Sequence, residues 1–344
     1  EGKDAAMLRA EMESGQIYEG LMALVYLDRI GRMDDYGPKL GAVIATMPQT
    51  DLSAEGEAPL RRAHGGQGPR AASRHSHFAE GQYRGRRPAS DDRGLACAQG
   101  QCDEPRAPIV ARLRDAGAII LGKANLSEWA NIRSDNSTSG WSAVGGLTRN
   151  PHALDRNTCG SSSGSAAAVA ASLAPLAIGT ETDGSITCPA GVNGIVGFKP
   201  TVGLVSRTFI VPISHSQDTA GPITLTVRDA AAVMTAIAGS DPADPATAEA
   251  DARKTDYTAV LSPDALKGKR IGVLRDRVGD RADIAALFAA ALKQMTQLGA
   301  TVVEIADSRK GTEGLGAAEF EVLLTELKAD MATYLGSLPN AATP

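Results

Sequence analysis

Two clusters of serine and glycine are the part of this sequence whose residue types and spacing could do chemistry. One lies at 160–165 and the other at 179–185, and an apolar, alanine-rich segment separates them. Small residues allow consecutive backbone N–H groups to face one point. Such a set of donors stabilises the oxyanion that develops in acyl transfer. The pattern therefore favours an oxyanion-stabilising site.

Three other interpretations of the clusters fit less well. Flexible linkers would not bracket apolar runs that are typical of a protein core. A nucleotide loop would carry G-x-x-x-x-G-K-[ST], which is absent. The G-x-S-x-G elbow of α/β-hydrolases is matched by Gly160, Ser162 and Gly164. That elbow must follow a strand, whereas residues 148–158 are polar and loop-like, and its histidine would have to be His215.

The elements that must position these clusters follow from the periodicity of the apolar residues. Between the clusters, residues 166–173 are typical of a helix and 176–178 of a short core segment. Elsewhere the pattern predicts helices at 5–13, 17–33, 227–239, 284–298 and 317–334, a loop at 240–250, and strands at 270–274 and 301–305. This alternation of strands and helices indicates an α/β fold with helices on both faces of a sheet.

The sequence also resembles a known family. The motifs GKANLSEWAN, SGWSAVGG, CGSSSGSA, GTETDGSI and SQDTAGP, between about 121 and 247, resemble the amidase signature family. Within it they look most like bacterial peptide amidases and less like the A-type component of aminoacyl-tRNA amidotransferases. The resemblance implies the amidase-signature fold, with a mixed central β-sheet covered by helices on both faces. It also implies hydrolysis of a carboxamide, such as the C-terminal amide of a peptide, through an acyl-enzyme and without a metal or organic cofactor.

The resemblance assigns roles to individual residues. Members of the family use a Ser-cisSer-Lys triad, one of the nucleophile variants that dispense with histidine. By position, Ser185 would be the nucleophile and Ser161 the bridging serine, held by a cis peptide bond. Thr182, Asp183 and Gly184 would supply the backbone N–H groups of the oxyanion hole.

The lysine of that triad is missing from the sequence as written. The family carries it on a buried strand, in a motif resembling G-I-P-x-x-V-K-D. Residues 61–106 occupy this position, and they contain nine arginines but no Lys, Ile, Val or Met. Taken at face value, this composition is that of a basic disordered loop or a nucleic-acid-binding arm.

A translational frameshift is our hypothesis for this segment. A shift of one nucleotide allows the codons for residues 75–84 to encode Ile-Pro-Ile-Leu-Leu-Lys-Asp-Asn-Ile, with the lysine across Glu80 and Gly81. The same shift allows residues 91–98 to encode Thr-Thr-Ala-Gly-Ser-Leu-Ala, and the frame would be restored near Pro105. Both shifted peptides resemble the family at this point.

The chain as written is expected to be a poor catalyst. A serine hydroxyl without a base is a weak nucleophile at neutral pH, and we expect the written segment to lose a core strand. Lys123 is interpreted as a lysine at a strand end rather than a replacement base, and Glu128 and Asp183 are the nearby carboxylates. The alternatives are a catalytically dead family member and an amidotransferase A-type subunit, which ammonia transfer to misacylated tRNA would distinguish.

Three parts of the chain are expected. Residues 1–60 would form N-terminal packing helices, 61–106 the anomalous arginine-rich segment, and 107–344 the amidase-signature α/β core. The first residue is Glu1 rather than Met, so we expect the start to be missing and any signal peptide with it. We also expect the C-terminal part of the fold to be missing beyond Pro344.

Composition limits the partners. A net charge of −5 and an aromatic content of 4% give no case for nucleic acid, and no apolar run reaches the roughly 18 residues of a membrane span. The expected partner is a small-molecule or peptide amide. The default location is cytoplasmic, with secretion and the oligomeric state left open. The four cysteines lack zinc-ligand spacing; they are Cys97, Cys102, Cys159 and Cys188.

Overall fold

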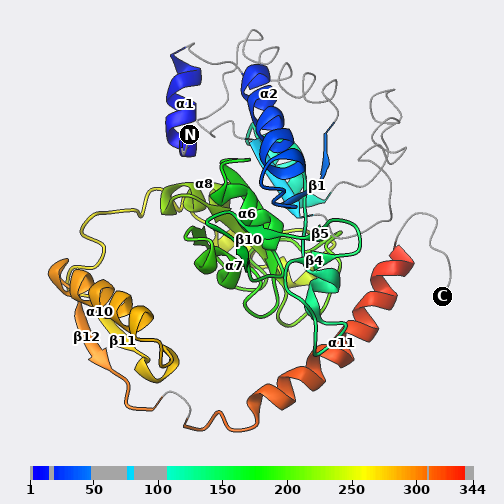
Figure 1. Cartoon of the computed structure of the whole chain (residues 1–344). Helices are drawn as coiled ribbons and strands as arrows, with labels where there is room; N and C mark the ends of the chain where they lie inside the picture. The colour runs from blue at the N-terminus through cyan, green and yellow to red at the C-terminus, as the bar shows by residue number, and fades with distance from the viewer. Residues whose placement is uncertain (1–2, 15–18, 48–75, 81–106, 308–309, 338–344) are drawn as a thin grey trace. The chain divides into compact units, whose positions relative to one another are not determined.

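The computed structural model of the chain describes residues 3–14, 19–47, 76–80, 107–307 and 310–337 (Figure 1). They form two compact units. One contains the chain up to Thr258 together with the chain from Glu326 onward, and the other spans Ala259–Thr325. Of the arginine-rich segment, only residues 76–80 are described, and the rest of it lies outside the described residues.

A mixed sheet organises the first unit. Six strands of the described residues pair in the order β1-β3-β2-β8-β10-β9. β2 is central and runs parallel to β3 and β8, whereas β1 and β10 are antiparallel to their neighbours β3 and β8. The strands are β1 (Val43–Thr46), β2 (Ser76–Glu80), β3 (Ile119–Ala124), β8 (Leu176–Glu181), β9 (Val196–Gly197) and β10 (Thr219–Thr224). The predicted mixed sheet is confirmed.

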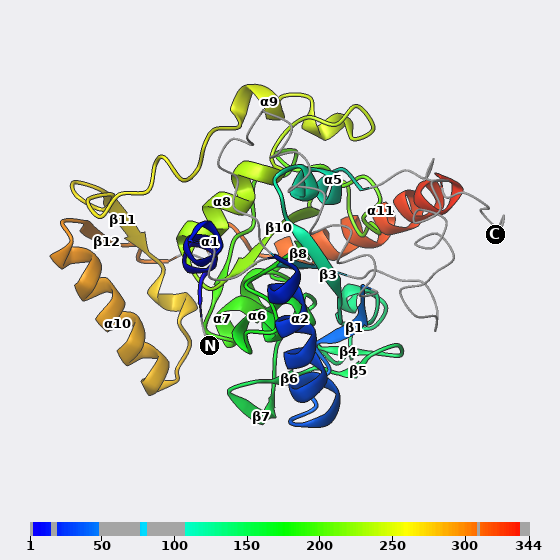
Figure 2. The ribbon, with the colours of Figure 1, turned by 90° about the horizontal axis from the view of Figure 1, so that it is seen from above.

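Helices cover both faces of this sheet, as predicted. Side chains alternate between the faces of a strand, so Ile119 and Leu121 of β3 join one core cluster and Ile120 joins the other. The first cluster contains residues of α2 (Glu19–Ile30) and α6 (Ser163–Ala170). The second contains residues of α5 (Pro108–Asp115) and α8 (Val227–Ile237). Figure 2 shows the two pairs of helices on opposite sides of the strands.

The strand β2 corrects one expectation. We expected the arginine-rich segment to deprive the chain of a core strand, because it lacks β-branched residues. The backbone of Ser76–Glu80 nevertheless forms the central strand, with Ser76 paired to Ile119 and Glu80 paired to Ala124. Pairing on both sides by parallel neighbours decides the conformation of these residues, so the tertiary context overrides their weak strand propensity.

The second unit contains a β-α-β arrangement. Strand β11 (Arg270–Val273) pairs in parallel with β12 (Thr301–Glu304), and α10 (Ala282–Gln297) connects them. α11 (Leu315–Ser337) follows. The predicted order strand, helix, strand, helix is confirmed, and helices end within a few residues of their predicted bounds. α11 begins in this unit, but its part from Glu326 onward belongs to the first unit.

The remaining elements are short or lie outside the sheet. None of the helices in the described ranges combines the length and apolar character that crossing a membrane requires. These elements are α1 (Ala5–Glu13), the π-helical turn η1 (Gly31–Tyr36), the 3-10 turns η2 (Glu128–Asn131), η3 (Pro245–Thr247) and η4 (Arg275–Arg277), the strands β4 (Trp141–Ser142), β5 (Gly146–Leu147), β6 (Arg149–Asn150) and β7 (Ala153–Asn157), and the helices α7 (Thr187–Val192) and α9 (Ala250–Arg253).

Candidate active site

Both serine clusters lie at one edge of the sheet. Since β3, β2 and β8 are parallel, their carboxyl ends meet at the same edge, where α/β proteins commonly bind ligands. β8 ends at Glu181 and leads directly into the turn that carries Ser185. β3 ends at Ala124, and the chain beyond it reaches the first cluster, because the N–H of Ser127 donates to the carbonyl of Ser161 over 3.0 Å.

Ser161 is buried at the start of α6. The peptide bond between Gly160 and Ser161 is cis. The Ser161 carbonyl also accepts a hydrogen bond from the N–H of Ser163, over 2.7 Å. The hydroxyl of Ser161 has no hydrogen-bond partner among the described residues, although its oxygen is fully buried. A buried polar atom without a partner is uncommon and calls for an explanation.

α6 brings Ser161 close to the sheet because its residues are small. Seven of its residues, from Ser163 to Val169, are buried. A Cβ on Gly164 would lie 2.3 Å from the carbonyl oxygen of Ala42 and 2.4 Å from that of Asn125, so only glycine allows this approach. The alanine-rich run of the sequence is thus a helix packed directly on the backbone of its neighbours.

Ser185 lies in the turn between β8 and α7. Its side chain is nearly buried, and its carbonyl accepts a hydrogen bond from the N–H of Ser162 over 3.1 Å, which joins the two clusters. Gly184, which precedes it, has φ +79°, a conformation that side chains disfavour. Ser161 and Ser185 line the same pocket. The structure therefore brings together the two serines that the sequence analysis selected.

Three side chains outside the turn hold it in place. Glu181 is buried, and its carboxylate accepts from the N–H groups of Ile186 and Thr187 over 2.7 and 2.9 Å, which caps α7 directly after Ser185. Lys199 Nζ donates to the carbonyl of Thr182 over 2.7 Å. The Thr182 hydroxyl donates to Asp218 Oδ1 over 2.5 Å. None of Glu181, Lys199 and Asp218 was selected from sequence.

The three residues expected to form the oxyanion hole occupy this turn. Thr182 lines the pocket together with Ser185, whereas Asp183 and Gly184 do not appear among the residues that line it. The Asp183 side chain is exposed. The role expected of Thr182, Asp183 and Gly184 is that of backbone N–H donors. Such a role does not require their side chains to face the pocket.

Charged residues also line the pocket. Arg207 lines it and forms an ion pair with Asp244, with 2.7 Å between Nη2 and Oδ1. The hydrogen bonds that Arg207 donates to Asp244 raise the pKa of Arg207. Asp218 also lines the pocket, and burial raises the pKa of its carboxyl although four neighbours counteract the shift: Thr182, Ser214, Ile213 and Arg207. Arg207, Asp218 and Asp244 were not selected from sequence, although SQDTAGP, which contains Asp218, was recognised as a motif.

A disulfide connects the two clusters. Cys159 and Cys188 are bonded, with 6.0 Å between their Cα atoms and a sequence separation of 29. Cys159 precedes the cis bond by one residue, and Cys188 follows Ser185 by three. The spacing of the four cysteines argued against zinc but did not predict this pairing. Cys97 and Cys102 lie outside the described residues.

Other candidates from the sequence lie apart from the pocket. Lys123 is exposed on β3, and Glu128 accepts a hydrogen bond from the N–H of Ala143 over 2.8 Å; neither lines the pocket. The hydrolase elbow is not formed, because the Ser162 hydroxyl bonds to the carbonyl of Thr180. Residues 148–158 are not the loop that we expected but contain the hairpin of β6 and β7, which is separate from the large sheet.

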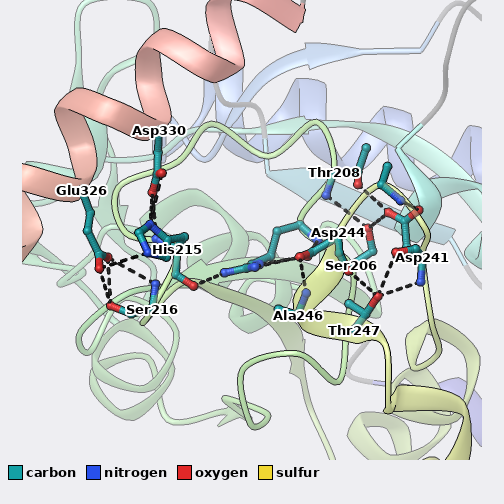
Figure 3. A network of polar contacts seen from close by, with 12 residues as sticks. Ser206, Thr208, His215, Ser216, Asp241, Asp244, Ala246, Thr247, Glu326 and Asp330 are labelled. Atoms are coloured by element: carbon teal, nitrogen blue, oxygen red, sulfur yellow. Dashed lines mark hydrogen bonds and ion pairs between the residues drawn. The ribbon is translucent and has the colours of Figure 1, made fainter.

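The histidine of the rejected elbow has other partners. Figure 3 shows the ring of His215 between two carboxylates of α11. Its Nδ1 lies 3.0 Å from Asp330 Oδ2 and its Nε2 lies 3.3 Å from Glu326 Oε1. Ligand atoms of the three side chains lie within 4.8 Å of one another, a spacing that could hold a metal ion. The hydroxyl groups of Ser214 and Ser216 donate to Glu326, so these side chains form a hydrogen-bonded cluster.

This sheet, with two serines at its carboxyl edge, is the fold of the amidase-signature enzymes, and the chain belongs to the amidase family. The family model described as Amidase matches residues 93–338. Among solved structures, that of the native peptide amidase from Stenotrophomonas maltophilia is similar. It has 46% sequence identity and a TM-score of 0.86, over 97% of this chain and 68% of that chain.

Two curated relatives are also similar in sequence. A probable amidase from Arabidopsis thaliana is 44% identical over 237 residues, which is 67% of this chain and 45% of the relative. The A-type component of a glutamyl-tRNA(Gln) amidotransferase from Acidothermus cellulolyticus is 45% identical over 230 residues, which is 66% of this chain and 44% of the relative. The chain thus spans less than half the length of these curated relatives.

Proposed function

We propose that the protein is an amide hydrolase that cleaves a carboxamide, such as the C-terminal amide of a peptide, through an acyl-enzyme. The observation that carries this proposal is the pairing of two buried serines in one pocket, next to a turn with a positive-φ glycine. Similarity to a peptide amidase over nearly the whole chain supports this substrate class.

Each residue then has a chemical task. Ser185 attacks the amide carbon and transfers its hydroxyl proton to Ser161, which passes its own proton to a base. The backbone N–H groups of Thr182, Asp183 and Gly184 stabilise the negative charge on the carbonyl oxygen. The proton returns through Ser161 to the leaving nitrogen, so ammonia departs and an ester remains on Ser185. Water then attacks the ester by the same route and releases the carboxylic acid.

The Ser161 hydroxyl has no partner among the residues that the structure describes, which supports a base that enters from the end of β2. Glu80 is the last residue of β2 and pairs with Ala124, the last residue of β3. Three residues further on, the N–H of Ser127 bonds to Ser161. A lysine encoded across Glu80 and Gly81 would therefore start at the sheet edge where Ser161 lies. This placement agrees with the frameshift hypothesis and gives the Ser161 hydroxyl a partner.

A component of a transamidase is the second candidate, and the similarity to a glutamyl-tRNA(Gln) amidotransferase favours it. Such a component would pass ammonia to misacylated tRNA in the presence of its partner proteins. An assay for that transfer, with partner proteins added from a related organism, separates the candidates: a hydrolase releases free ammonia from a peptide amide without them.

The test begins with the gene across the codons for residues 61–106 and with the intact mass of the purified protein. If the shifted frame is found, we expect release of ammonia from a peptide carboxamide. Ser185→Ala should reduce it by about 10³-fold or more, because loss of a nucleophile leaves only binding and the oxyanion hole. Retention of the rate by Ser185→Ala would refute Ser185 as nucleophile. If the written frame is confirmed, hydrolysis should be close to background.

A further inference from the structure

Asp218 is connected to the turn that precedes Ser185 by a single side-chain contact. The Thr182 hydroxyl donates to its Oδ1 over 2.5 Å, and Thr182 is the first residue after β8. Hydrogen bonds to a carboxylate are shorter and stronger than neutral ones. Nothing in the proposed chemistry uses the Thr182 hydroxyl, so its contact with a nearly buried carboxylate at the pocket wall needs a separate account.

The other oxygen of Asp218 belongs to a different segment. Oδ2 accepts from the N–H groups of Ile213 and Ser214, over 2.8 and 2.9 Å. The carboxylate therefore joins the turn after β8 to the loop that runs from Ile213 to Asp218. Since all three donors point at one buried group, its position is fixed by the loop as much as by the turn.

That loop is in turn held by α11. The N–H of His215 donates to Asp330 Oδ2 over 2.9 Å, and the hydroxyl of Ser216 donates to Glu326 Oε2 over 2.9 Å. Glu326 and Asp330 are four residues apart, so both carboxylates face the loop from one side of the helix. Figure 3 shows both of them directed at His215 and Ser216. A continuous set of polar contacts thus runs from α11 through the loop to Asp218 and Thr182.

We propose that Asp218 is a positioning residue for amide hydrolysis. It fixes Thr182, and through it the direction of the backbone N–H groups that stabilise the oxyanion, while α11 holds the loop that carries it. This inference rests on the proposed function for its catalytic meaning, but the restraint on the turn exists with or without turnover. Preorganised donors are effective because they do not reorient during reaction, and small displacements of such groups cost about 10²-fold in rate.

A matched pair of variants tests the restraint. Thr182→Val keeps the shape of the side chain but removes the hydroxyl, whereas Thr182→Ser keeps the hydroxyl. In hydrogen exchange measured by mass spectrometry on the full chain, we expect peptides that cover 179–188 to exchange faster in Thr182→Val than in the parent, and Thr182→Ser to match the parent. Thr296→Val, which removes a hydroxyl bonded within α10, is the control and should leave these peptides unchanged.

Kinetics separates positioning from simple loss of stability. In protein that hydrolyses an amide, Thr182→Val should lower kcat by about 10- to 100-fold with little change in KM, and Thr182→Ser should restore most of it. Asp218→Asn should also lower kcat, and the double variant should be little worse than the poorer single variant, because both changes break one contact.

The outcomes distinguish the two proposals. Equal exchange at 179–188 in Thr182→Val and Thr182→Ser would overturn the positioning role, whatever the activity. A different result is faster exchange in Thr182→Val together with no Ser185-dependent hydrolysis, whether the protein is made from the written or the shifted reading frame. It would uphold the restraint of Thr182 by Asp218 and refute the proposed function. Additive effects of Thr182→Val and Asp218→Asn on kcat would show that Asp218 acts independently of Thr182, and would also overturn the inference.

Discussion

The surroundings of Ser185 and those of Ser161 differ in completeness. Around Ser185, three side chains bond to the turn or to the helix that follows it: Glu181 caps α7, Lys199 holds the Thr182 carbonyl, and Asp218 holds the Thr182 hydroxyl. Around Ser161 the backbone is equally well bonded, yet the hydroxyl itself is buried with no described partner.

This difference agrees with the hypothesis that the sequence as written lacks the triad lysine. An orphaned buried hydroxyl typically costs about 1–3 kcal/mol, so a natural protein has reason to supply a partner. Both serines lie within residues 107–258, where the motifs of the family are intact. The partner that the Ser161 hydroxyl lacks among the described residues would, in our proposal, come from the segment whose codons we infer to be shifted. We therefore expect the turn at 182–185, with Ser185 as the proposed nucleophile, to function once a base is present.

The largest effect should come from restoring a base at the end of β2. Glu80→Lys in the chain as written places an amine at the position that the shifted frame predicts for lysine. We expect the rate of amide hydrolysis to rise by about 10²-fold or more, because an adjacent base activates a serine nucleophile. The measurement is ammonia release from a peptide carboxamide, with the Ser185→Ala background subtracted.

The matched control for this change is Glu80→Arg. A guanidinium brings the same charge, but it stays protonated in proteins and cannot accept a proton. Equal gains from lysine and arginine would mean that charge alone improves the site, and the absence of any gain from lysine would remove the end of β2 as the source of the base.

The next largest effect concerns the disulfide that connects the two sides. Cys159→Ser with Cys188→Ser should lower the free energy of unfolding by about 2–4 kcal/mol, because the bond closes a loop of 29 residues in the unfolded chain. Denaturant unfolding measures this loss. Because Cys188 is exposed, a thiol-free reductant should reproduce most of it in the parent.

The double serine variant is also the control for reduction, since it retains Cys97 and Cys102. Its unfolding midpoint should not respond to the reductant. A reductant effect of the same size in parent and variant would assign the stabilisation to other cysteines, and the two serine clusters would then be held together by hydrogen bonds and packing alone.

Sequence predicted those features that depend on local pattern. The small residues of both clusters, the apolar alternation of the strands and the helical periodicities all act within a few residues, so the sheet, its helices and the two serines could be found. The roles of Asp218 and Glu181 could not be predicted, because they depend on where the folded backbone places the N–H groups that these carboxylates accept from. β2 was missed for a related reason: its neighbours β3 and β8, rather than its own residue types, make it a strand.

The smallest effect is a pH dependence on the Ser161 side. Asp34 is buried, and its carboxylate accepts from the N–H groups of Ala42 and Val43. Ala42 lies against α6, because its carbonyl oxygen would be 2.3 Å from a Cβ on Gly164, and it accepts from the N–H of Asn125 over 2.7 Å. Burial raises the pKa of Asp34 from 3.8 to about 6 even though both N–H groups oppose the shift.

A raised pKa means that the folded protein holds this proton more tightly than the unfolded chain does. The associated stability is complete below about pH 4 and is lost as pH rises through about 6, and the shift corresponds to at most about 3 kcal/mol.

Asp34→Asn cannot ionise, so the difference in free energy of unfolding between parent and variant should change in favour of the parent as pH falls from 7 to 4. Asp35→Asn, at the exposed neighbour whose charge is the smallest contribution to the shift, should keep most of the parent's pH dependence. Parallel curves for the parent and Asp34→Asn would show that the carboxyl ionises alike in the folded and unfolded chain. The segment beside Ser161 would then be ordered without any contribution from the protonation of Asp34.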